Sequence, residues 1–163
     1  MTDSESAALA SAGVVGRIAA FDLALAVLEQ DGPAVARVIG RLRTCGQAEQ
    51  AAHCCELHLN ALLTRALQQA GVPAGAVATS MPAEALAERI STLLDFLYYP
   101  VETEEVVAAF VAGDLGPLRG LRGTPGLVAR AVAAVGLGLV VRSQSRLKAL
   151  LEADRARHVR HQE

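Results

Sequence analysis

Between Leu127 and Val141 the chain runs for fifteen residues with Arg130 as its only charged side chain. A helix that crosses a bilayer needs about 20 apolar residues, so this stretch is too short to span a membrane. In water, a helix that is apolar nearly all round has to be covered by its own fold or by a partner chain. The stretch therefore predicts a buried helix, either at the centre of its own bundle or against a partner chain.

Other parts of the chain repeat apolar residues at helical spacing. The clearest stripe has steps of four and three residues and predicts a helix over 4–30; it consists of Val14, Ile18, Phe21, Leu25 and Leu28. Similar spacing predicts helices after Pro33, over 47–70, after Ser80 and from Thr103. No strand-like alternation lasts for more than four residues. The sequence thus predicts an all-α fold.

Glycine and proline mark the expected helix ends. In the run Asp31-Gly32-Pro33, we expect Gly32 to provide a left-handed cap and Pro33 to fit the first turn of the next helix. Residues 71–82 contain two glycines and two prolines, and residues 113–126 contain five glycines and two prolines. Both segments predict loops, the second with a single turn over 117–121.

The last helical region is expected to be long. It should begin at Thr124-Pro125, bend near Gly136 and Gly138, and become solvent-exposed from Arg142 onwards. Residues 142–163 carry six basic and three acidic side chains. This change in character predicts a buried half followed by a basic, solvated half.

Composition favours one compact domain. The chain has 163 residues, of which 52% are apolar and 3% aromatic, so the core is expected to consist of closely packed Leu, Val, Ile and Ala. We expect a single domain over 1–163 with six or seven helices, and fraying at residues 1–5 and 156–163. The formal net charge of −2 excludes a globally basic nucleic-acid binder.

The cysteine count and the first residues favour a cytoplasmic protein. Three cysteines are an odd number in a chain that is large enough to fold without disulfides, which is typical of reduced thiols. The acidic first residues lack the positive region of a secretory signal. We therefore expect a cytoplasmic protein without a membrane span.

The densest chemical cluster of the sequence is a candidate soft-metal site formed by His53, Cys54, Cys55 and His58. On a helix Cys54 and His58 share a face, and a thiolate with an imidazole suits zinc or copper. One helix supplies at most two or three ligands to an ion, so Cys45, His158, His161 or a second copy would complete the set. Cys54 beside His58 also suits an activated thiol. The simpler interpretation makes Cys55, with or without Cys54, a small core residue, and His53 and His58 surface or hydrogen-bonded residues.

The glycine-rich stretch offers a second candidate site, in which Arg119 and Arg122 would bind an anion ahead of a helix start. It lacks the Gly-Lys-Ser/Thr of a Walker loop, and no strand precedes it. A connector that needs glycine for its turns is the simpler interpretation. The basic C-terminal tail lacks aromatic residues that stack on nucleic-acid bases, so a nucleic-acid partner is not favoured.

We expect this chain to be a non-enzymatic interaction or regulatory module that forms a homodimer, or binds another protein, through apolar faces of its first or last helix. No nucleophile, base and oxyanion arrangement can be quoted from the sequence, and we name no cofactor. The first alternative is a metal or thiol sensor that uses the His53-Cys54-Cys55-His58 cluster. The second is phosphate or nucleic-acid contact through Arg119, Arg122 and the C-terminal tail.

Overall fold

A computed structural model describes residues 2–70, 100–121 and 123–160. These residues form six α-helices and one 3₁₀ turn: α1 (Asp3–Leu28), α2 (Gly32–Thr44), α3 (Ala48–Gln69), α5 (Pro100–Ala112), η1 (Gly116–Gly120), α6 (Thr124–Val141) and α7 (Gln144–Arg160). No strand occurs in these ranges, which confirms the all-α prediction. The loop expected over 71–82 and the helix expected after Ser80 lie outside the described residues.

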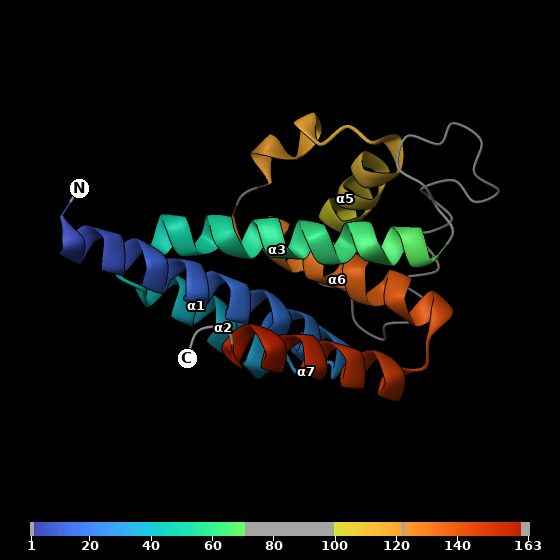
Figure 1. Cartoon of the computed structure of the whole chain (residues 1–163). Coiled ribbons are helices and arrows are strands. Elements are labelled where there is room, and N and C mark those ends of the chain that lie inside the picture. Colours follow the sequence, from blue (N-terminus) through green and yellow to red (C-terminus); the bar gives the residue numbers. More distant parts are fainter. Residues whose placement is uncertain (1, 71–99, 122, 161–163) are drawn as a thin grey trace.

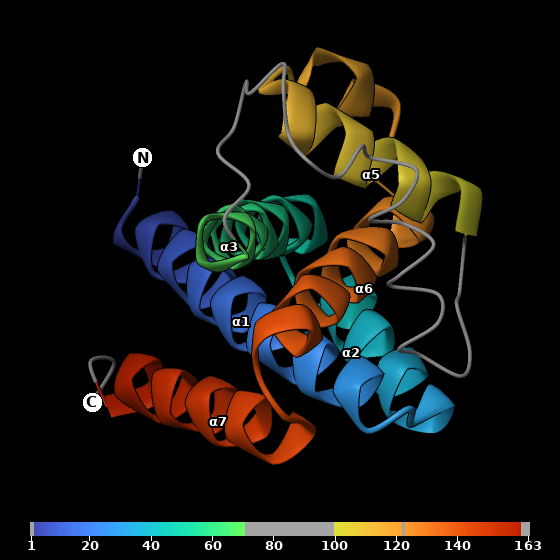
Figure 2. The same ribbon diagram turned by 90° about the vertical axis from the view of Figure 1, so that its right-hand side faces the viewer.

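Helix α6 lies at the centre of the bundle, with α1, α3 and α5 packed against it (Figure 1 and Figure 2). Every residue from Gly126 to Gly138 is buried. The all-round apolar character of this segment therefore follows from its position, because it has protein on all sides. Of the two expected ways to cover this helix, by its own fold or by a partner chain, the structure shows the first.

Helices α1 and α3 run side by side in the same direction (Figure 1), and at Gly16 the α3 backbone lies very close to α1. A Cβ atom placed on Gly16 would lie 2.3 Å from the carbonyl oxygen of Ala51 and 2.7 Å from the Cβ of Cys54. Only glycine fits there, because the closest neighbouring atom belongs to the backbone and cannot rotate away. Close packing through small residues, which the scarcity of aromatic residues predicted, is thus visible at this crossing.

The break between α1 and α2 uses a different residue from the one expected. Gln30, with φ of 54°, adopts the left-handed conformation, whereas Gly32 already belongs to α2. The Asp31 carboxylate accepts a hydrogen bond from the backbone N–H of Ala34, and Pro33 lies in the first turn. The stop and restart are confirmed, but the assignment of the left-handed cap to Gly32 is wrong.

Two further boundaries differ from expectation. Helix α5 begins at Pro100 rather than at Thr103, which is 1% exposed inside the helix and does not cap it. The C-terminal region consists of two helices, because Arg142 is extended (φ −135°, ψ 155°) and the chain folds back there (Figure 1). Gly138 allows α7 to come close: an added Cβ would lie 2.9 Å from Cδ2 of Leu147.

Helix α7 packs along α1 and is joined to it by charge pairs. Lys148 Nζ lies 2.7 Å from Glu29 Oε1, and Arg155 Nε donates to Asp22 Oδ1 at 2.6 Å. The basic tail expected from the sequence therefore meets acids of the first helix. Of the ends expected to fray, residues 3–5 belong to α1 and residues 156–160 to α7, whereas residues 1 and 161–163 lie outside the described residues.

Two glycine-to-alanine variants test the close approach of α1 and α3. Gly16→Ala should lower the free energy of unfolding by about 1–3 kcal/mol, because the methyl group overlaps the α3 backbone. Gly40→Ala is the matched control: its Cβ would have no atom within 4 Å, so the gain in helix propensity should raise stability by about 0.5–1 kcal/mol. Urea denaturation followed by circular dichroism measures both. Equal effects of the two substitutions would contradict the proposed packing.

Candidate functional site

The four candidate metal ligands on α3 point in different directions. His53 is exposed, whereas Cys54 is half-buried with its Sγ near Gly13 of α1. Cys55 is 0% exposed and belongs to the core, and His58 is half-buried. Among the described residues, no group of three or more His, Cys, Asp or Glu side chains is arranged to hold a metal ion.

Only one of these residues meets a partner that the sequence had suggested. The ring of His58 lies 5.5 Å, centroid to centroid, from the ring of His158 on α7, and His158 lies 5.1 Å from Phe21 on α1. The pKa of His58 is lowered from its ordinary value, first by burial and then by the positive charges of His158 and Arg17. Three helices thus meet where His58, His158 and Arg17 lie close enough to interact electrostatically.

The anion candidates on the glycine-rich segment are only partly described. Arg119 is exposed on η1, which confirms the expected single turn, and Arg122 lies outside the described residues. Gly126 permits a close approach of two backbone segments: an added Cβ there would lie 1.9 Å from the carbonyl oxygen of Leu121. This contact folds the segment onto the start of α6.

Sequence reasoning missed the buried charge that lies under this segment. Arg130 is 1% exposed and donates from Nε to Asn60 Oδ1 at 2.9 Å, from Nη1 to the carbonyl oxygen of Leu121 at 2.7 Å and from Nη2 to Glu56 Oε1 at 3.2 Å. An arginine inside a buried helix requires such partners. The isolated charge in an apolar run was the available signal, but its partners come from distant parts of the chain.

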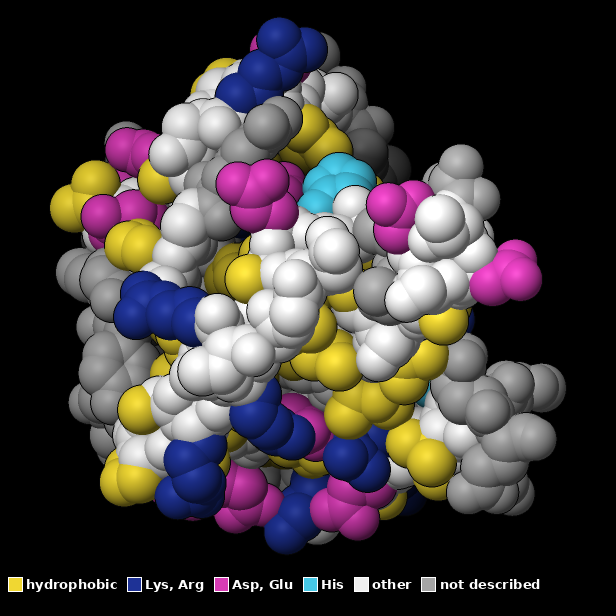
Figure 3. All heavy atoms as spheres, turned by 90° about the vertical axis from the view of Figure 1, so that its left-hand side faces the viewer, with side chains coloured by type: hydrophobic (Ala, Val, Ile, Leu, Met, Phe, Trp, Pro, Cys, Tyr) yellow, Lys and Arg dark blue, Asp and Glu magenta, His cyan; other side chains and the backbone are white. Residues whose placement is uncertain are grey.

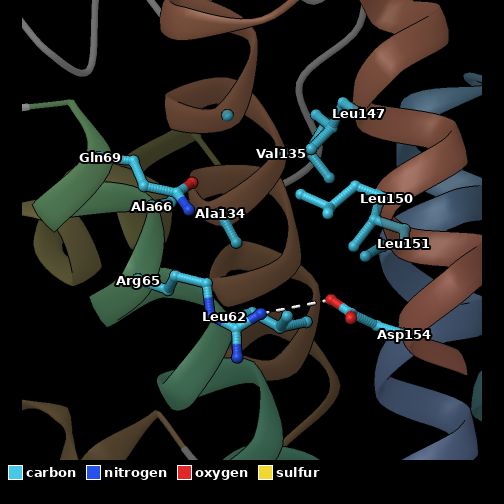
Figure 4. Close-up of a pocket in the computed structure, with 12 residues that line it drawn as sticks. Leu62, Arg65, Ala66, Gln69, Ala134, Val135, Leu147, Leu150, Leu151 and Asp154 are labelled. Atoms are coloured by element: carbon cyan, nitrogen blue, oxygen red, sulfur yellow. Dashed lines mark hydrogen bonds and ion pairs between the residues drawn. The ribbon is translucent and has the colours of Figure 1, made fainter. Parts of the chain in front are cut away.

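A small cavity lies beneath α7, between α1, α3 and α6 (Figure 4). Its walls are mostly aliphatic, and at its edge Arg65 Nη1 lies 3.2 Å from Asp154 Oδ2. The volume is about 40 Å³, which suits a few water molecules, whereas small-molecule sites usually exceed about 300 Å³. The Arg65–Asp154 pair instead joins α3 to α7.

The N-terminal part of α1 extends past the ends of α3 and α7 (Figure 1). Thr2 and Glu5 form a capping box: the N–H of Glu5 donates to Thr2 Oγ1 at 3.1 Å, and the N–H of Thr2 donates to Glu5 Oε2 at 3.0 Å. Among the residues of this helix whose side chains the structure describes, Ala12 is the first buried one. The turns before Ala12 are thus helical, and their described side chains, at residues 2–7, 10 and 11, are exposed. Such turns are only marginally stable in water by themselves.

One face of this projecting helix is apolar at its centre and charged at both ends. We call it the α1 stripe: Asp3, Ala7, Ala10, Val14 and Arg17, spaced by four, three, four and three residues. The first three of these residues are exposed and the last two are half-buried. Figure 3 looks onto this end of the molecule and shows hydrophobic side chains gathered near its middle.

No protein-family model, curated protein or solved structure matches this chain.

Among the described residues, α1 and α6 are long and apolar enough to cross a membrane, by length and composition alone. The α6 helix, at 18 residues, is longer than the fifteen-residue run expected from the sequence. Within the bundle, 72% of the most apolar window of α6 and 56% of that of α1 are buried. Since a core helix passes the same test, this result is weak evidence for a membrane span.

Thiol titration tests the placement of the cysteines. Burial raises the pKa of the Cys55 thiol to about 12, although the charge of Arg130 opposes this shift, so at pH 8 the reactive thiolate is scarce. We expect two thiols, Cys45 and Cys54, to react with Ellman's reagent in the native protein and three in denaturant. Cys55→Ala should show two under both conditions. Rapid reaction of three native thiols would contradict this placement.

Replacing the buried arginine should be far more costly than replacing an exposed one. In Arg130→Met the Glu56 carboxylate and the Leu121 carbonyl lose their donor inside the protein, so the free energy of unfolding should fall by about 3–5 kcal/mol. Arg119→Met, on the surface of η1, should change stability by less than about 0.5 kcal/mol. Guanidinium denaturation of both variants measures the difference. Similar stability of the two would show that the Arg130 contacts are not needed for folding.

Proposed function

We propose that this protein is a non-enzymatic interaction module that forms a homodimer through the N-terminal half of α1. The observation that carries the proposal is the α1 stripe, a helical face with Ala7, Ala10 and Val14 at its centre that the described part of the chain leaves largely uncovered. Alanine side chains let two helix axes approach to about 8 Å, which increases the contact between backbones. A second helix laid along the stripe would cover it.

The buried part of helix α6 does not offer an apolar face for dimerisation. The sequence left open whether α6 is covered by its own fold or by a partner, and the burial of Gly126 to Gly138 supports the first solution. Among the two helices expected to mediate dimerisation, α7 already uses its apolar side, since Leu147 and Leu151 are buried against the bundle. The first turns of α1 are the part that lacks such cover.

The other two candidate functions find less support in the arrangement of the residues. A metal or thiol sensor would need His53, Cys54, Cys55 and His58 to act together, yet these residues face solvent, α1, the core and α7 in turn. An anion site would rest on Arg119 alone among the described residues. The free Cys45, Cys54 and Cys55 are consistent with a reducing compartment, and we propose the cytoplasm.

A charged substitution at the centre of the stripe tests self-association. Ala10→Glu should leave the fold intact, because residue 10 is exposed, but it would place two like charges close together in the dimer. We expect the dimer dissociation constant to rise by about 100-fold or more, measured by analytical ultracentrifugation over a range of concentrations.

The matched control introduces the same charge elsewhere. Ala153 is exposed on α7 and lies outside the stripe, so Ala153→Glu should dimerise like the unmodified protein. A protein that sediments as a monomer at every concentration would refute the proposed function. Equal loss of dimer in both variants would show that net charge, rather than the α1 stripe, controls association.

A further inference from the structure

We infer that the two copies pair their α1 helices antiparallel, in the register that places Asp3 of one copy against Arg17 of the other. This inference rests on the proposed self-association and adds the geometry of the contact. It defines which surface of the second copy fits the α1 stripe, and it makes the interface symmetric, so that each dimer contains the Asp3–Arg17 contact twice.

The spacing along α1 defines this register. Asp3 and Arg17 lie seven residues before and seven residues after Ala10, which is two helical turns or about 10 Å in each direction. A twofold axis through Ala10 therefore brings each charged end of the stripe to the opposite end of its copy. Between these ends Ala7 would lie near Gly13 of the second copy, and the helices would meet through small residues.

The charges at the two ends lack partners within the described protein. The guanidinium of Arg17 and the carboxylate of Asp3 form no hydrogen bond or ion pair with other side chains in the described ranges. Arg17 lies one turn before Phe21, which packs against His158, and His158 lies beside His58. Burial lowers the pKa of His58 most, and the charges of His158 and Arg17 lower it further, so a carboxylate that arrives at Arg17 would lie near other basic side chains.

Acids near this spot are already engaged. On α1, Asp22 pairs with Arg41 and Arg155; on α7, Asp154 pairs with Arg65 and Arg157. Asp22 and Asp154, the acids next to Phe21 and one turn before His158, are thus already paired with other arginines and do not neutralise Arg17. Asp3 of a second copy carries the charge that is missing.

The antiparallel direction also fits the positions of the two bundles. Each bundle covers its own α1 from Ala12 onwards, so pairing about Ala10 keeps the two bundles at opposite ends of the contact. The N-terminus of the second α1 would then point toward the C-terminal end of α7, and the two helix dipoles would attract. A parallel pair would instead place Asp3 against Asp3 and Arg17 against Arg17, where like charges repel.

A charge-swap experiment tests the register directly. Asp3→Lys and Arg17→Glu should each weaken the homodimer about tenfold or more, because every Asp3–Arg17 contact becomes repulsive. Mixed together, the two variants should form heterodimers in preference to either homodimer, since both contacts are again between opposite charges. The double variant Asp3→Lys/Arg17→Glu should regain the homodimer. Native mass spectrometry distinguishes these species by mass.

Two further variants serve as controls. Arg37→Glu makes the same charge change on the exposed surface of α2 and should leave the dimer unaffected. Asp3→Asn removes the charge without adding repulsion and should weaken the dimer only a few-fold, whereas a parallel pair would become tighter. If Ala10→Glu abolishes the dimer but the swapped variants do not prefer each other, the register is overturned and self-association stands. A monomeric unmodified protein overturns both.

Discussion

The guanidinium of Arg130, enclosed in the bundle, requires the surrounding elements to meet at one point. It donates to Asn60 and Glu56, which lie one turn apart on α3, and to the carbonyl oxygen of Leu121. A buried charge without these oxygens would be strongly unfavourable, so α6 cannot slide along α3 or rotate about its axis without losing them. The glycine-rich segment before α6 is held over the same group. The apolar contacts of the core supply most of the burial, and this polar contact selects one arrangement among those that would bury similar area.

Local patterns were sufficient to predict the helices but not their exact limits or their neighbours. The stripes of apolar residues predicted α1, α2, α3 and the buried character of α6, because periodicity directly reflects which face is covered. The left-handed residue at Gln30 and the break at Arg142 depend on how the next helix packs, and local preferences for Gly32, Gly136 and Gly138 do not contain that information. For the same reason Thr103 suggested a helix start although it lies inside α5.

For the candidate sites, too, the local residues were predicted but not the contacts that depend on tertiary packing. The sequence drew attention to His58 and suggested His158 as a partner, and the structure brings the two rings together. The simpler interpretation, in which Cys55 is a core residue, agrees with its burial. The sequence could not show that Glu56 pairs with a residue 74 positions away, because that contact depends on the packing of α3 against α6. The sequence also did not show which turns of α1 are uncovered, because a stripe of apolar residues has the same spacing whether or not α7 extends far enough to cover it.

One continuous helix forms both the exposed stripe and part of the core. Leu23, Val27 and Leu28 of α1 are buried, while the turns that begin at Asp3 face outward on the same rigid rod. Any partner that binds the outer turns only when they are helical therefore also favours the folded state as a whole, by mass action. Under the proposed self-association, this continuity would make the thermodynamic stability of the protein depend on its own concentration.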